Sequence, residues 1–209
     1  MTTSREADRT RKRYNRIAPI YNAMEWVVEQ IAFRAWRAKL WSYLGDGQQV
    51  LEVGVGTGKN FPYHPSGAHV VGVDLSERML VQAKRKRQAT GEDVPLAQLD
   101  AQRMAFADDV FDAAVATFVF CSVPDPVRGL REIRRVVKPG GQVVLLEHVR
   151  VNAPVVGPVM DTLDPLVVQV MGAHIKRHTE KNVRRAGLVV KKVEALAPGQ
   201  LVKLISAQA

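Results

Sequence analysis

The stretch VLEVGVGTGKN, residues 50–60, constrains the fold more than any other part of the sequence. A short apolar segment typical of a buried strand leads directly into three closely spaced glycines, Gly54, Gly56 and Gly58. Glycine adopts backbone angles that other residues avoid, and it lets a ligand lie against the main chain. The stretch therefore predicts a strand that ends in a ligand-binding turn.

Apolar, strand-like segments alternate with amphipathic helical segments through the rest of the chain. This order predicts a parallel sheet that is covered by helices on both faces. Ser76 and Asp125 are the expected N-caps of two helices, and Pro126 suits a first helical position. The predicted strands are 49–53, 69–73, 95–99, 111–117 and 142–149, the predicted helices are 22–44, 76–88 and 125–137, a turn is predicted at 138–141, and a terminal hairpin at 188–193 and 200–206.

The chain has 209 residues, 46% of them hydrophobic and 24% charged, which fits one globular domain. Cys121 is the only cysteine, and residues 1–13 lack the apolar core of a secretory signal. We therefore expect a cytoplasmic protein without an internal disulfide. Residues 154–171 are apolar but contain Asp161 and Asp164, which would cost roughly 5–7 kcal/mol in a membrane span. We interpret them as a helical lid or an interfacial segment.

The spacing of the glycines argues against a dinucleotide. The nicotinamide fingerprint needs a third glycine five residues after the first, where this chain has Lys59. Asp74 ends the second predicted strand, 20 residues after Gly54, where a carboxylate accepts hydrogen bonds from both ribose hydroxyls. Asp100 follows the third strand and is expected to accept from an adenine amino group. Two apolar residues are expected beside the ring: Leu75 and Ala101. One such aspartate alone is more often a turn residue, but together with the glycine turn they favour a nucleoside site.

Four motifs follow one another along the chain: EVGVGTG at 52–58, GVDLS at 72–76, LDAQRMAFADDVFD at 99–112 and REIRRVVKPGG at 131–141. In this order they resemble successive motifs of the class I S-adenosylmethionine-dependent methyltransferases. The resemblance implies one α/β, doubly wound, Rossmann-like domain. Its seven-stranded sheet would be mostly parallel with an antiparallel last strand, preceded by N-terminal helices. We expect a helical N-terminal segment at 1–46, which caps the site and contacts the membrane, and a methyltransferase domain at 47–209.

The resemblance also implies S-adenosylmethionine as the cofactor and S-adenosylhomocysteine as the product. Glu52 and the glycine turn would lie along the methionine portion, Asp74 on the ribose, Asp100 on the adenine and Thr117 beside the reactive end. The predicted cofactor-binding residues are Glu52, Gly54, Gly56, Gly58, Asp74, Leu75, Asp100, Ala101 and Thr117.

The acceptor is argued from residues outside these motifs. RYNRIAPIYN, residues 13–22, resembles the YxxxAxxYD segment of small methyltransferases that act on phospholipid amines, quinones and thiols. Here Asn22 replaces the usual aspartate, so no role is given to that carboxylate. Tyr21 and His148 are the predicted catalytic residues, which would orient the acceptor or take its proton. The alternatives are that the tyrosines pack a helix onto the sheet and that the histidine is structural.

We expect N-methylation of phosphatidylethanolamine and of its mono- and dimethyl products. The alternatives are a quinone carbon or a small thiol as acceptor. The net charge is +9, and six basic residues fall within 4–16. With the aromatic residues of 22–44 they favour peripheral contact with an anionic membrane, although a solvated face would have the same composition.

A nucleic-acid-binding module is the non-enzymatic alternative that the charge leaves open. The sequence lacks an aromatic-and-basic strand motif, so we expect no nucleic acid partner. His174 and His178 lack a third ligand nearby in the sequence, so no metal site is assigned. We expect a monomer.

Overall fold

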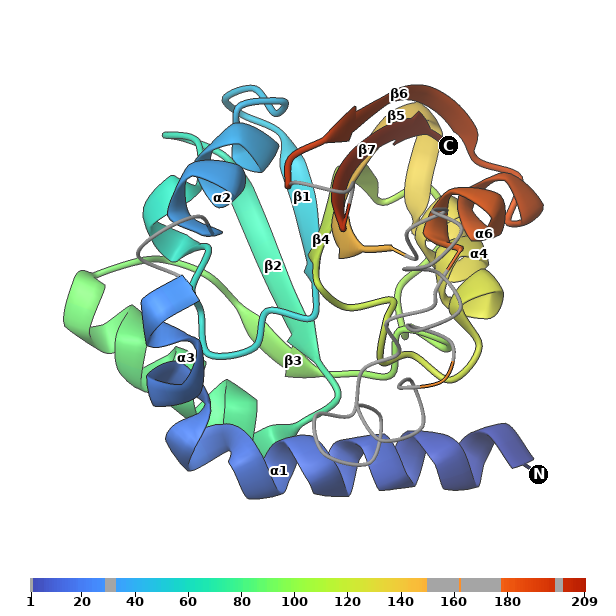
Figure 1. Ribbon diagram of the computed structural model, residues 1–209. Coiled ribbons are helices and arrows are strands. Elements are labelled where there is room, and N and C mark those ends of the chain that lie inside the picture. Colours follow the sequence, from blue (N-terminus) through green and yellow to red (C-terminus); the bar gives the residue numbers. More distant parts are fainter. Residues whose placement is uncertain (1, 29–32, 150–161, 163–177, 198–200) are drawn as a thin grey trace.

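The computed structural model describes residues 2–28, 33–149, 162, 178–197 and 201–209. A seven-stranded sheet in the order β3-β2-β1-β4-β5-β7-β6 forms its centre (Figure 1). β7 runs antiparallel to β5 and β6, and the other pairings are parallel. The strands are β1 (Gln49–Val53), β2 (His69–Asp74), β3 (Leu96–Gln98), β4 (Phe111–Thr117), β5 (Val137–His148), β6 (Val189–Ala195) and β7 (Val202–Gln208). The predicted fold class and the terminal hairpin are confirmed.

Helices cover both faces of the sheet, and each face has its own hydrophobic core (Figure 1). Because side chains alternate along a strand, Val50 of β1 packs into one core and Leu51 into the other. The first core includes side chains of α2 (Arg34–Trp41) and α3 (Glu77–Thr90). The second includes side chains of α4 (Pro126–Val136) and α6 (Thr179–Arg185).

Two of the helices begin at the residues that the sequence indicates. The Ser76 hydroxyl accepts a hydrogen bond from the Met79 amide at the start of α3, over 3.2 Å. Asp125 accepts from the Arg128 amide at the start of α4, over 3.0 Å. Such caps satisfy amides that have no partner within the helix, and each stabilises a helix by about 1 kcal/mol. Both caps place the loops before them, and these loops belong to the site described below.

The single helix predicted at 22–44 is wrong. The structure has α1 over Thr2–Val28 and the separate helix α2, and residues between them lie outside its description. α1 therefore includes the basic segment 4–16, which belongs to the N-terminal segment predicted to be helical, and it continues through Pro19. α1 lies across the edge of the sheet at which the parallel strands end (Figure 1).

Residues 138–141, predicted as a turn before the strand, lie inside β5. Phe111 pairs with Val137 but Ala113 pairs with Gln142, so the extra residues form a bulge in the ladder. Gly140, within this bulge, has a φ of +79°, an angle that glycine adopts more easily than other residues. The predicted lid at 154–171 falls outside the described residues except for residue 162. Within the described helices, none has the length and apolar character needed to cross a membrane.

Candidate functional site

A pocket that is partly open to solvent lies where β1, β2, β3 and β4 end. Because these strands are parallel, their carboxyl ends bring together residues that are far apart in the sequence. α1 forms a further wall of the pocket, with Thr10, Tyr14 and Tyr21. The predicted site residues that line the pocket are Tyr21, Gly54, Gly56, Asp74, Leu75, Asp100, Ala101 and Thr117.

The three glycines after β1 have different surroundings. All have positive φ angles, +70° at Gly54, +57° at Gly56 and +78° at Gly58. A Cβ on Gly54 would lie 2.3 Å from Val119 Cγ2, and one on Gly58 would lie 2.5 Å from the ring of Phe61. A Cβ on Gly56 would meet only the Gly54 carbonyl oxygen, at 4.0 Å. Gly56 thus keeps open the space that a ligand would need along the main chain, whereas Gly58 is required by packing.

Asp74 closes the glycine turn. Its Oδ2 accepts from the Gly56 amide over 2.9 Å, and its Oδ1 accepts from the Ser76 amide over 2.8 Å. A carboxylate has about four acceptor positions, so both oxygens keep capacity for the two hydroxyls of a ribose. The pKa of Asp74 is raised to about 6, mainly by burial and to a lesser extent by the nearby Glu52 carboxylate, while hydrogen bonds from the Ser76 and Gly56 amides oppose the rise. Ligand hydroxyls would stabilise the ionised form.

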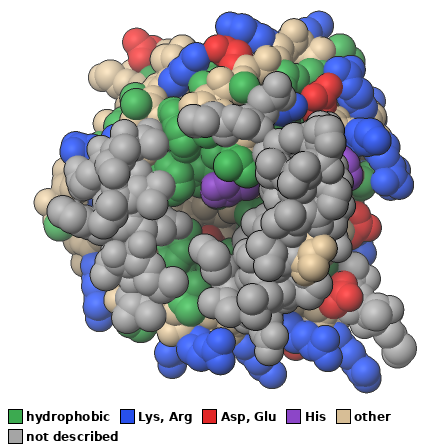
Figure 2. All heavy atoms as spheres, viewed as in Figure 1, with side chains coloured by type: hydrophobic (Ala, Val, Ile, Leu, Met, Phe, Trp, Pro, Cys, Tyr) green, Lys and Arg blue, Asp and Glu red, His purple; other side chains and the backbone are tan. Residues whose placement is uncertain are grey.

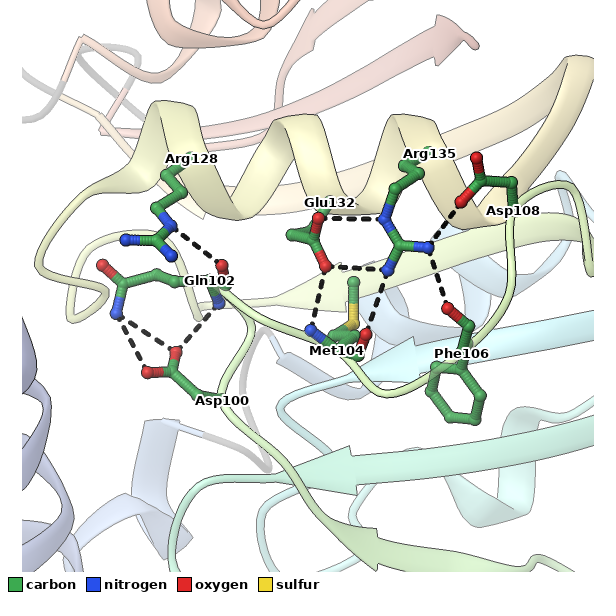
Figure 3. Close-up of polar contacts among 8 residues, drawn as sticks. All are labelled: Asp100, Gln102, Met104, Phe106, Asp108, Arg128, Glu132 and Arg135. Carbon is green, nitrogen blue, oxygen red and sulfur yellow. Dashed lines mark hydrogen bonds and ion pairs between the residues drawn. The ribbon is translucent and has the colours of Figure 1, made fainter.

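Asp100 is held by Gln102, a residue that the sequence analysis did not single out (Figure 3). The amide of Gln102 donates to Asp100 Oδ1 over 2.8 Å, and the Gln102 side chain reaches both carboxylate oxygens. Gln102 is in turn tied to the start of α4, because its side chain accepts from the Asp125 amide and its carbonyl from Arg128. Asp100 therefore has a fixed orientation toward the pocket, and its Oδ2 retains acceptor capacity. The sequence signal for this contact is the position of Gln102 two residues after Asp100, because an aspartate often accepts from the backbone amide two residues later in an Asx-turn.

Arg135 of α4 fixes the other half of the loop that follows β3 (Figure 3). Its guanidinium donates to the carbonyls of Met104 and Phe106 and to the carboxylates of Asp108 and Glu132. The hydrogen bond from Arg135 lowers the pKa of Glu132, whose carboxylate also accepts from the Met104 amide. The loop that carries Asp100 is thereby attached to α4 at both ends.

The end of β4 is shaped by a buried carboxylate. Glu147 Oε1 accepts from the amides of Val119 and Phe120, each over 2.9 Å. Phe118, which lies between Thr117 and Val119, has a φ of +57°. That angle is costly for a residue with a side chain, so the surrounding contacts must impose it. As a result Thr117, Phe118 and Val119 all face the pocket.

Glu52 and Gly58 do not line the pocket in the described structure. Glu52 is buried beneath it, where its Oε1 accepts from Asn60 over 2.8 Å and its Oε2 lies 3.1 Å from His64 Nε2. Asn60 also donates to the Thr117 hydroxyl and accepts from Arg37 of α2. Glu52 thus supports the floor of the pocket, and its predicted contact with the cofactor stays a prediction.

The two predicted catalytic residues lie in different places. Tyr21 lines the pocket next to Tyr14, with ring centres 6.5 Å apart, and Lys59 Nζ lies 5.3 Å from the Tyr21 ring centre. His148 is not among the described pocket-lining residues. Its ring stacks on Phe118 with centres 4.4 Å apart, so it contacts a residue of the pocket wall.

Further pocket-lining residues were missed by sequence reasoning: Thr10, Met79, Val119, Ser122 and Pro124. For Thr10 a signal existed, since Thr10, Tyr14 and Tyr21 share one face of a helix, within about 40° of one another at 100° per residue. That signal required knowing that α1 begins near Thr2.

A glycine turn, two strand-terminal carboxylates and an apolar wall are the features expected of a nucleoside site in a doubly wound protein. Residues 51–145 match the family described as a methyltransferase domain. The ubiquinone/menaquinone biosynthesis C-methyltransferase UbiE of Bdellovibrio bacteriovorus is 35% identical over 152 residues, which cover 70% of this chain and 65% of that protein. The phosphatidylethanolamine N-methyltransferase of Cereibacter sphaeroides is 43% identical over 104 residues, 49% of this chain and 51% of that protein.

The fold agrees with these matches. The crystal structure of a SAM-dependent methyltransferase from Thermotoga maritima superposes with a TM-score of 0.68 at 22% identity, covering 93% of this chain and 97% of that one. These matches support a class I S-adenosylmethionine-dependent methyltransferase domain at residues 51–145, with S-adenosylmethionine as the methyl donor. The chain spans about half to two thirds of the length of the two relatives named above.

Proposed function

We propose that this protein transfers the methyl group of S-adenosylmethionine to a lipid acceptor, with the amine of phosphatidylethanolamine and of its methylated products as the first candidate. The match to a phosphatidylethanolamine N-methyltransferase, at 43% identity over 104 residues, supports this acceptor. The single structural observation that carries the proposal is the open space at Gly56. It lies beside the two carboxylate oxygens of Asp74, each of which can accept a further hydrogen bond. It fits a ribose with an adjoining methionine chain.

Bound S-adenosylmethionine would supply an electrophilic methyl group on a positively charged sulfur. In the transfer the carbon–sulfur bond breaks as a carbon–nitrogen bond forms, and the amine loses a proton. Asp74 and Asp100 would hold the nucleoside, and α1 would keep water from the reacting atoms. Alignment of the acceptor nitrogen with the methyl carbon is the main task left to the protein.

Tyr21 is the candidate for that alignment, because its side chain lies in the pocket on the wall formed by α1. The Lys59 ammonium near its ring is attracted by the ring electrons and helps to fix the ring. His148 remains a candidate proton acceptor through an intervening water, since it stacks on the pocket-lining Phe118 and is not among the described lining residues. The proton would otherwise pass to water.

Contact with an anionic membrane is the second part of the proposal. Four basic residues of α1 are exposed and fall within about 60° of one another on the helix, opposite the face that lines the pocket. Lys and Arg side chains gather along the edge of the molecule where α1 lies (Figure 2). We call these residues the α1 stripe: Arg5, Arg9, Lys12 and Arg16. Each basic residue near an anionic surface is worth about 1 kcal/mol of attraction.

A quinone carbon is the second candidate acceptor, supported by the longer match to a C-methyltransferase of quinone biosynthesis, 152 residues at 35% identity. It is also lipid-soluble, so the α1 stripe does not separate the two. The test is incubation of the protein with methyl-labelled S-adenosylmethionine and vesicles that contain phosphatidylethanolamine and a demethylated quinone. Label in mono- and dimethylated phosphatidylethanolamine supports the first acceptor. Label confined to the quinone replaces it with the second, and no label in any lipid contradicts the proposal.

A further inference from the structure

Asn15 joins α1 to the corner between β2 and α3. Its Oδ1 accepts from the Ser76 hydroxyl over 2.7 Å and from the Arg78 amide over 3.2 Å. The Arg78 amide is one of the first amides of α3 and has no partner within that helix. Asn15 therefore completes the N-terminal cap of α3 from a different helix.

The same corner holds the carboxylate that faces the pocket. Ser76 donates its amide to Asp74 and its hydroxyl to Asn15, and this hydroxyl also accepts from the Met79 amide. Ser76 is buried, so these bonds form where little water competes for them. The attachment of α1 and the orientation of Asp74 thus depend on one residue.

α1 is both attached here and part of the pocket. Thr10 and Tyr14 precede Asn15, and Tyr21 follows it, and all three face the pocket. Ala7 and Ala18 are buried on the same side of the helix. α1 therefore contributes three of the described pocket-lining side chains, and its position affects how a ligand in the pocket exchanges with solvent.

We infer that Asn15 is a positioning residue that fastens α1 over the bound cofactor and sets the rate at which S-adenosylmethionine and S-adenosylhomocysteine leave. The inference rests on the proposed function, since it takes this pocket as the cofactor site. The coupling is reciprocal: if docked α1 slows ligand release by strengthening binding, bound ligand holds α1 in place by the same free energy.

The test compares Asn15→Ala with Asn15→Asp. Asp keeps an acceptor oxygen for Ser76 and Arg78, and its charge suits a helix N-terminus, whereas Ala removes both bonds. Glu6→Ala is the matched control, because Glu6 is an exposed residue of α1. The dissociation rate of S-adenosylhomocysteine is measured at pH 8, where Asp74 is ionised. Two hydrogen bonds lost at about 1 kcal/mol each correspond to a rate increase of about tenfold or more in Asn15→Ala.

Asn15→Asp and Glu6→Ala are expected to release the ligand at a rate close to that of the parent protein. Rates in Asn15→Ala that equal the parent rate, or rates in Asn15→Asp as fast as in Asn15→Ala, would overturn the inference. Fast release from Asn15→Asp would show that an acceptor oxygen at this position does not suffice to fasten α1.

Trypsin cleavage within α1 provides a second readout. S-adenosylhomocysteine is expected to slow this cleavage in the parent protein and in Asn15→Asp, and to slow it several-fold less in Asn15→Ala. Equal protection in all three variants contradicts the inference while leaving the proposed function intact. A parent protein that binds no S-adenosylhomocysteine contradicts the proposed function itself, and the two failures are thereby distinguished.

Discussion

Arg78 donates a hydrogen bond from Nη1 to the backbone carbonyl of Asn15, over 3.4 Å. This carbonyl lies four residues before Pro19, so it is the one that would accept from residue 19 in a regular helix. Proline has no amide hydrogen, and its ring disturbs this carbonyl. A side chain of α3 thus supplies the donor that α1 lacks, which helps α1 to continue through Pro19.

The first prediction is a coupling between Arg78 and Pro19. Arg78→Met removes the donor, and Pro19→Ala restores an amide that the Asn15 carbonyl can accept from. Arg78→Met is expected to cost about 1 kcal/mol of local stability in α1 in the parent protein and about 0.5 kcal/mol less in the Pro19→Ala background. The rate of trypsin cleavage within α1 under native conditions measures this local opening. Additive effects of the two substitutions would show that Arg78 does not compensate for Pro19.

The second prediction separates two glycines of the turn. In Gly58→Ala the new methyl group lies 2.5 Å from the buried Phe61 ring at a φ of +78°, so we expect a loss of about 2–4 kcal/mol in unfolding free energy. In Gly56→Ala only the φ of +57° is unfavourable, at about 1 kcal/mol, and the methyl group projects toward open space.

Calorimetry of the two variants checks this difference. Gly56→Ala should fold and bind S-adenosylhomocysteine more weakly than the parent protein. Gly58→Ala should instead show a lower unfolding free energy than the parent protein. A Gly56→Ala variant that binds the ligand as tightly as the parent protein would show that no ligand lies against Gly56.

The third prediction concerns Asp74 and pH. Its pKa is raised to about 6, mainly by burial, so in the folded protein it takes up a proton below about pH 6, whereas in the unfolded chain it does so near pH 4. This group therefore makes the unliganded protein more stable as the pH falls from 6 to 4, because the folded state binds more protons there. Ribose hydroxyls need the ionised carboxylate as acceptor, so affinity for S-adenosylhomocysteine should instead fall below pH 6, by up to about tenfold per pH unit.

Asp74→Asn is the matched variant. It should weaken binding at pH 8 by about 1.5–3 kcal/mol, the usual value for hydrogen bonds to a charged group, and should remove most of the pH dependence. Calorimetric titrations between pH 5 and pH 8 measure both effects. The same pH profile in both proteins would exclude Asp74 as the titrating acceptor.

The fourth prediction tests the α1 stripe. Replacing its four basic residues by glutamine should reduce binding to anionic vesicles by a hundredfold or more, at about 1 kcal/mol for each charge. Binding of S-adenosylhomocysteine should change little, because these side chains lie opposite the pocket face of α1. Vesicle sedimentation at low and at physiological salt provides the measurement. Equal binding of both proteins would indicate that the α1 stripe is only a solvated surface.

Most of the fold could be predicted because its signals are local. The bounds of β1 and β4 follow from apolar runs that end at turns, and Ser76 and Asp125 mark helix starts by their capping chemistry. The pocket-lining aspartates Asp74 and Asp100 could be predicted too, because parallel strands bring their carboxyl ends to one edge.

The remaining features depend on contacts between distant segments. The path of α1 through Pro19 is supported by a donor from Arg78, which is remote in the sequence. Similarly, Glu52 and His148 have residue types that are common in sites, yet they contact Asn60 and Phe118 and are not among the described pocket-lining residues. Glu147 acts by holding the chain after β4, and no sequence pattern reveals that contact.

The most direct test of the account is a crystal structure of the protein with S-adenosylhomocysteine. The account predicts the ribose hydroxyls within hydrogen-bonding distance of the Asp74 carboxylate, the adenine amino group at Asp100 and the amino acid chain of the ligand along Gly56. It also predicts α1 in place, with Asn15 bonded to Ser76. A ligand bound elsewhere, or bound in this pocket without contact to Asp74, would contradict it.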